Sequence, residues 1–178
     1  EEFIEANAEL AEFPFLAINI YDRATDTLVD YCTPSVTVEC GAATIGIIGA
    51  IGDCYSSISG DKVENIYFKT GEELNSLIRA ESERLRAEGA DFIVLSIHDG
   101  GADASLSKEH VDLVFEGHTH KSYAKADRYS VYHLQGGGDN DGITHAAAVI
   151  NFADSVRRSD ITVIGCAGCA EEQFNHAA

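Results

Sequence analysis

The pattern of apolar and polar positions in the first part of the chain predicts one exposed helix followed by three strands. Residues 1–12 mix Glu and Ala with a few apolar side chains, which is typical of a solvated helix. The short apolar run 15–20 predicts a buried strand. Two further β-branched runs, 36–38 and 43–49, predict strands joined by a hairpin turn at 41–42.

The clearest helix that the sequence predicts covers Glu72–Glu88. Thr70 is placed to cap it, and Glu73 is placed to return the bond in a capping box. Gly89 follows the helix and supplies a left-handed stop. The apolar residues recur at helical spacing and so mark one buried face: Leu74, Leu77, Ile78 and Leu85.

The second half of the chain continues the alternation of helix and strand. The nearly continuous apolar run 92–97 predicts a strand covered on both faces. A polar stretch near 105–110 predicts a short helix before the next strand, 111–115. Later apolar runs predict a hairpin with a wide loop and a last strand: 129–134 paired with 143–152, then 161–164. This order predicts an α/β layered domain.

The charge balance excludes several classes of function. The chain has 178 residues, with 12 Lys and Arg against 30 Asp and Glu, and a formal net charge of −18. Such an acidic surface repels phosphate backbones and anionic lipids, so we expect neither a nucleic acid polymer nor a membrane surface as partner. No apolar run reaches the roughly 18 residues that a membrane span needs, and no signal peptide opens the sequence.

The cysteines give only a weak signal. There are five, too few and too scattered for a disulfide scaffold: Cys32, Cys40, Cys54, Cys166 and Cys169. The last two have the CxxC spacing of a redox motif or half a zinc site, and His176 lies nearby without completing a four-ligand set. We expect small buried or tail thiols, with a thiol or zinc role for the CxxC pair as the alternative.

Three histidines follow predicted strands and are the strongest candidates for chemistry. His98 ends the 92–97 strand, and His118 and His120 follow the 111–115 strand within Gly117-His118-Thr119-His120. Chemistry in α/β sheets collects beyond the carboxyl ends of strands, so neighbouring strands would bring the three imidazoles together. Imidazole is the commonest metal-binding side chain. The spacing therefore predicts a metal site, whereas the other histidines are expected to be surface or core residues.

Two segments carry a resemblance to a known family. The run Ile93–His98, followed after some twenty residues by Asp112–His120, resembles the calcineurin-like metallophosphoesterases, closest to the branch with bacterial 5′-nucleotidases and 2′,3′-cyclic-nucleotide phosphodiesterases. Phe13–Asn19 and Ile45–Gly49 are similar to core strands of that family. The resemblance implies an αββα layered sandwich. Residues 1–152 would form the C-terminal portion of a metallophosphoesterase domain, and 153–178 a short strand and tail.

The resemblance also implies a metal-dependent activity. In that family two divalent ions, Mn, Zn, Mg or Fe, activate a water and clamp the oxygens of a phosphate ester. By resemblance His98 and His118 would bind one ion and His120 the other, while no residue is assigned as a catalytic acid or base. The expected substrate is a small, nucleotide-like phosphate ester. Members of the branch commonly work in the cell envelope or outside the cell.

Three family elements do not occur in this sequence: an Asp-x-His, a Gly-Asp and an Asn-His-Glu segment. The domain is therefore expected to be N-terminally incomplete and weakly active or inactive by itself. Asp99, Asp103, Asp139 and Asp141 lie at no family ligand position. The alternative is a binding or interaction module with at most one metal on three histidines. Exposed sheet edges would favour a homo-oligomer, and the absence of methionine indicates a trimmed segment or missing modified methionines.

Overall fold

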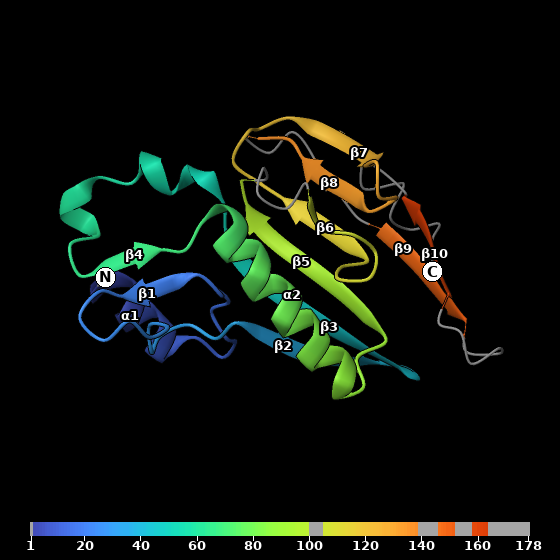
Figure 1. Ribbon diagram of the computed structural model, residues 1–178, viewed down its shortest axis with the longest axis horizontal. Coiled ribbons are helices and arrows are strands. Elements are labelled where there is room, and N and C mark those ends of the chain that lie inside the picture. The colour runs from blue at the N-terminus through green and yellow to red at the C-terminus, as the bar shows by residue number, and fades with distance from the viewer. Residues whose placement is uncertain (1, 100–104, 139–145, 152–157, 164–178) are drawn as a thin grey trace.

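A six-stranded mixed sheet organises the chain in the computed structural model, which describes residues 2–99, 105–138, 146–151 and 158–163 (Figure 1). The strand order is β2-β3-β5-β6-β8-β7. The inner four strands run parallel to one another, and the two edge strands run antiparallel to their neighbours. The bounds are β2 Ser35–Cys40, β3 Ala43–Ile51, β5 Phe92–His98, β6 Leu113–Glu116, β7 Ser122–Ala126 and β8 Tyr132–Gly136.

Helix α2, Gly71–Ala87, covers one face of this sheet (Figure 1). Its buried residues Leu74, Ile78 and Leu85 join the main core. The sheet contributes its fully buried side chains to the same cluster: Ile48, Ile93, Leu95 and Val114. These clustered residues are all apolar, so the hydrophobic effect fixes which face of the sheet the helix covers.

Part of the opposite face of the sheet packs against a two-stranded ribbon, β9 Ala146–Asn151 paired antiparallel with β10 Arg158–Val163. Ala146 and Ile150 of β9 pack against a second cluster from the sheet, built on Phe92, Leu113 and Leu134. The three layers are therefore helix, sheet and ribbon. They confirm the α/β fold class that the sequence predicts.

The local predictions for the hairpin and the long helix hold, with one exception. Strands β2 and β3 form the expected hairpin, and Gly41 in its turn has φ +63°. Gly89 ends α2 with φ +107°. The capping box is wrong, because Thr70 occupies the N-cap position but its side chain caps no backbone N–H. Its carbonyl oxygen instead accepts the N–H of Glu73 at 3.2 Å.

The N-terminal part differs from the predicted strand over 15–20. Helix α1, Glu2–Leu10, is present and buries no residue. The following segment is irregular because its N–H groups bond to different partners: Ala17 donates to Thr33 O at 3.0 Å and Ile18 to Gly49 O at 2.9 Å. The regular strands here are β1, Ile20–Asp22, and β4, Ile66–Phe68, which pair antiparallel.

The predictions for the second half hold only in part. Ser105 lies in a 3₁₀ helix, but residues 106–110 form no helix, because Ser107 O accepts the N–H of both His110 and Val111 and closes a single turn. The predicted hairpin between 129–134 and 143–152 is not formed either. β8 pairs with β6 and β7, while β9 pairs with β10. Strand β7 escapes prediction because its sequence, Ser-Tyr-Ala-Lys-Ala, has no β-branched residue.

Among the residues that the structure describes, no helix combines the length and the apolar character that a membrane span requires.

Candidate metal site

The candidate site lies at the edge of the sheet where its parallel strands end. Ile51, the last residue of β3, is in register with His98, the last residue of β5. On the other side of β5, Ile97 is in register with Glu116, the last residue of β6. The turns that leave these three strands are therefore neighbours in space. This is the place at which chemistry collects in open α/β sheets.

The structure brings two of the three predicted histidines together. The rings of His98 and His118 have centroids 5.3 Å apart and meet edge to face, with an interplanar angle of 76°. Gly117 makes this possible, because a Cβ at position 117 would lie 2.9 Å from Nδ1 of His98. Both side chains are exposed, so their ring nitrogens are accessible from solvent.

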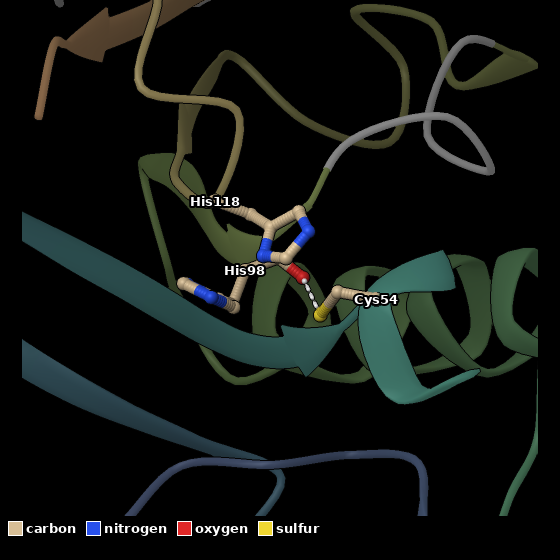
Figure 2. A group of neighbouring side chains, drawn as sticks. All are labelled: Cys54, His98 and His118. Carbon is tan, nitrogen blue, oxygen red and sulfur yellow. Dashed lines mark hydrogen bonds between the residues drawn. The ribbon is translucent and has the colours of Figure 1, made fainter. Parts of the chain in front are cut away.

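Cys54 is the third member of the group and is a residue that the sequence reasoning missed (Figure 2). One ligand atom each from Cys54, His98 and His118 lie within 4.8 Å of one another. Cys54 belongs to the 3₁₀ helix η1, Asp53–Ser57, directly after β3. Its thiol is buried and donates a hydrogen bond to the carbonyl oxygen of His98 at 3.1 Å.

His120 lies outside this group of three. Its ring packs against the loop after β8, where a Cβ at Gly138 would lie 2.5 Å from Cγ of His120. β8 is the parallel neighbour of β6, so His120 belongs to the same edge of the sheet, one strand further along. The expectation that His120 binds a second ion stays a prediction.

The backbone at this edge is held in a conformation that non-glycine residues rarely adopt. Asp99, His118 and His120 have φ of 75°, 76° and 57°. Each such residue costs on the order of 1–3 kcal/mol and persists only where surrounding structure enforces it. Strain of this kind gathers at ligand sites, and here all three residues lie in the turns that leave the parallel strands β5 and β6.

Side-chain hydrogen bonds hold the turn that carries the histidines. Thr119, between His118 and His120, donates to Gln135 Oε1 at 3.1 Å and accepts from Gln135 Nε2 at 2.7 Å. Gln135 is 2% exposed and belongs to β8, so this buried amide anchors the turn to the sheet. Glu116, just before the turn, contacts His133 Nδ1 at 2.5 Å and accepts a bond from Tyr123.

The turn that carries Cys54 is also fixed to the sheet. The Gly52 N–H donates to His98 O at 2.9 Å, and a Cβ at Gly52 would overlap the carbonyl of Asp99. Asn19, fully buried, holds Ile51 through two bonds: Asn19 Nδ2 donates to Ile51 O at 2.7 Å and Ile51 N donates to Asn19 Oδ1 at 3.0 Å. These hydrogen bonds keep the start of η1 in contact with the end of β5.

Two carboxylates act electrostatically on the Cys54 thiol. Burial raises the pKa of Cys54, and the nearby carboxylates of Asp99 and Asp53 raise it further. The same negative charges favour the approach of a cation. Asp99 is therefore placed to influence the group electrostatically.

Several residues singled out in the sequence fall outside the described residues: Asp103, Asp139, Asp141, His145, Cys166, Cys169 and His176. His133 is buried against Glu116, in agreement with the expectation of a core histidine.

The donor set at this edge fits one divalent ion. Imidazole and thiolate suit Zn²⁺ and similar transition metals, and three ligands of this kind leave a fourth position free in a tetrahedral site. Within residues 2–99, 105–138, 146–151 and 158–163, no second group of three His, Cys, Asp or Glu ligands lies close enough to hold another ion. The described residues therefore do not by themselves fit a two-ion centre.

The chain matches no protein-family model. Over 163 residues it is 26% identical to an apyrase from Tabanus yao, and the match covers 83% of this chain but 28% of the apyrase. The chain thus spans less than a third of the length of this relative.

The chain also resembles solved structures in its fold. The sulfate thiohydrolase SoxB from Thermus thermophilus aligns with a TM-score of 0.74 and 20% identity, over 92% of this chain and 30% of that one. The calcineurin-like phosphoesterase YfkN from Bacillus subtilis aligns with a TM-score of 0.73 and 16% identity, over 92% and 59%. A 5′-nucleotidase precursor from Thermus thermophilus aligns with a TM-score of 0.63 and 18% identity, over 90% and 35%. The chain therefore has the calcineurin-like phosphoesterase fold, in the form found in 5′-nucleotidases.

Proposed function

We propose that this chain forms part of a metal-dependent phosphate-ester hydrolase that acts on small, nucleotide-like substrates. The observation that carries the proposal is the meeting of His98 and His118 at the edge where the parallel strands end. In the calcineurin-like phosphoesterase fold, that edge is also where the sequence resemblance places metal ligands. The similar proteins, an apyrase, a 5′-nucleotidase precursor and a calcineurin-like phosphoesterase, support the same class of reaction.

His98 and His118 would hold the ion, with the neutral imidazole nitrogens as donors. A divalent ion bound there would polarise the phosphoryl oxygens and supply an activated water. The chain's own residues then have a positioning task. Gly117 has no Cβ that would overlap the His98 ring. The two hydrogen bonds between Thr119 and Gln135 anchor the turn that carries His118 to the sheet.

The charge of the chain makes a local cation necessary for this function. The formal net charge is −18, which repels an anionic ester over the distance of a Debye length, about 8–10 Å. An ion at the His98–His118 edge would reverse the sign of the potential at one place. We therefore expect the metal-loaded chain to bind the substrate and the metal-free chain not to bind it.

The experiment measures metal content and hydrolysis together. The purified chain is loaded with Zn²⁺ or Mn²⁺, desalted and analysed for bound metal, then assayed with p-nitrophenyl phosphate, a nucleoside monophosphate and a 2′,3′-cyclic nucleotide. We expect bound metal and hydrolysis in the parent and loss of both in His118→Ala. His110→Ala is the matched control, since His110 lies in a turn away from the site and should retain the parent's metal. Equal metal content in His118→Ala and the parent would refute the assignment.

A second candidate function is a binding module that holds one ion without turnover. It is favoured by the single group of three ligands among the described residues and by the lack of a carboxylate within it. Metal stoichiometry separates the two candidates. One ion per chain without hydrolysis of any of the three esters supports the module, whereas two ions per chain would exclude it and support a two-ion centre that includes His120.

A further inference from the structure

Among the cysteines that the structure describes, Cys54 is the one that lies beside histidines. Cys40 is exposed in β2 and Cys32 is half-buried near the N-terminal segment, and neither belongs to a group of metal-binding side chains among the described residues. Cys54 is 8% exposed, yet its sulfur lies within 4.8 Å of the ligand nitrogens of two exposed histidines. The group thus combines a buried thiol with two imidazoles that are exposed to solvent.

We infer that Cys54 is a metal ligand, and that with His98 and His118 it binds a thiophilic divalent cation such as Zn²⁺. This inference rests on the proposed function, because it takes the same edge to be a metal site. It goes beyond it by naming a sulfur donor, which changes the class of ion that the site takes.

The position of the sulfur is built into the fold. Gly52 brings the start of η1 into direct contact with the end of β5, and its N–H shares the His98 carbonyl with the Cys54 thiol. The donor distances are 2.9 Å for the Gly52 nitrogen and 3.1 Å for the Cys54 sulfur. Asn19 fixes the end of β3 just before this turn. The Cys54 thiol is therefore held against His98 by its own hydrogen bond, by the bond of Gly52 and by the bonds of Asn19 to Ile51.

The spacing fits a tetrahedral ion after small side-chain movements. Zinc bonds of about 2.3 Å to sulfur and about 2.0–2.1 Å to nitrogen place neighbouring ligand atoms roughly 3.3–3.8 Å apart. The three ligand atoms now lie within 4.8 Å of one another, so closure needs movements on the order of 1 Å. The two exposed imidazoles supply them by rotation, because their rings are not packed in the core.

The charge balance favours the same assignment. On binding, the S–H proton passes to solvent and the sulfur–metal bond takes its place, so the ligand set brings one negative charge. A soft sulfur donor beside two imidazoles selects Zn²⁺ or Co²⁺ over Mg²⁺ and Ca²⁺, which prefer oxygen ligands.

Cobalt spectroscopy tests the assignment without depending on turnover. Co²⁺ alone is titrated into the reduced full chain, and the absorption is recorded in the visible, where tetrahedral Co²⁺ absorbs, and in the near ultraviolet, where thiolate-to-cobalt charge transfer absorbs. We expect both signals in the parent chain. Cys54→Ser should lose the near-ultraviolet band and bind at least about tenfold more weakly, since even changes outside the ligand shell cost 10- to 100-fold. Cys40→Ser is the matched control and should keep the parent's spectrum.

The outcomes separate the inference from the proposed function. Visible cobalt bands without the thiolate band, or a thiolate band that survives in Cys54→Ser, would refute the sulfur ligand and leave a histidine site intact. Absence of any cobalt signal in the parent would refute both. Cys54→Ser retains a hydroxyl donor for the His98 carbonyl, and Cys54→Ala provides a second variant. Circular dichroism confirms that either one is folded before its spectrum is compared.

Discussion

Gly52→Ala is a substitution for which the structure forecasts a large effect from one methyl group. Gly52 has φ −84°, which any residue adopts, so the left-handed region is not the reason for glycine here. The reason is space. A Cβ at position 52 would overlap the carbonyl oxygen of Asp99 and lie 2.8 Å from its carbonyl carbon. Both atoms are backbone, so no side-chain rotation relieves the contact.

The size of the effect follows from two contributions. An ordinary carbon–oxygen contact is about 3.3 Å, so η1 and the end of β5 must separate by about 1.5–2 Å. Overpacking of this kind costs about 1–3 kcal/mol. The same movement strains the bond from Gly52 N to His98 O, now 2.9 Å, which contributes about 0.5–1.5 kcal/mol. We therefore expect Gly52→Ala to lower the free energy of unfolding by about 1.5–4.5 kcal/mol.

The assay is denaturant unfolding followed by circular dichroism, with cobalt binding measured on the same samples. Gly60→Ala is the matched control, because a Cβ at Gly60 meets nothing within 4 Å and its φ is not positive. The control should be within about 0.5 kcal/mol of the parent, as surface substitutions usually are. If Gly52→Ala unfolds at the same denaturant concentration as Gly60→Ala and binds cobalt equally, the close approach of the two turns does not hold the site together.

Three further predictions test the core, the support of the site and the thiols. Leu95→Ala should cost about 2–5 kcal/mol through a cavity in the centre of the sheet and leave metal content unchanged in the folded fraction, which unfolding curves and metal analysis check. Asn19→Leu leaves the N–H and carbonyl of Ile51 without their amide partner, so it should lower the free energy of unfolding by about 1–3 kcal/mol in the same measurement. A decrease of less than about 0.5 kcal/mol would contradict this prediction. Burial raises the pKa of Cys32 to about 11, so its reactive thiolate is scarce at pH 8 and grows about tenfold per pH unit up to pH 10. Mass spectrometry of alkylated peptides should find Cys32 slower than exposed Cys40 at pH 8 and accelerating with pH; equal rates would refute the burial argument.

The elements that the sequence predicts well are those whose pattern is local. The run 92–97 is apolar at nearly every position because α2 buries Ile93, Leu95 and Ile97, while the other face of β5 is buried only at its start, at Phe92, and is exposed at Ser96. Glycines at 41 and 89 mark turns because a positive φ is needed there. His98 and His118 were found for the same reason, since each directly follows a buried strand.

The parts that escaped prediction depend on pairing between distant segments. The sequence gives no sign that β8 pairs with β7 and not with β9, because both partners offer similar short strands. Cys54 was missed because its relation to His98 exists only through the parallel register of β3 and β5. A signal was nevertheless present: Cys54 follows a predicted strand by a few residues, as the two histidines do. The capping box failed because Thr70 had a backbone alternative at the start of α2.

The parallel alignment of β3, β5 and β6 has a consequence for the folding of the chain. The three donors come from the ends of three adjacent strands, and each residue of register shift would move one donor by about 3.3 Å relative to the next. Only the native alignment offers all three to one cation. A bound ion would therefore link the ends of the three strands. It would add RT ln(1 + [M]/Kd) to the free energy of unfolding, which is about 2.7 kcal/mol at a free metal concentration of a hundred times Kd. The stability of this edge of the sheet would thus rise with the metal concentration.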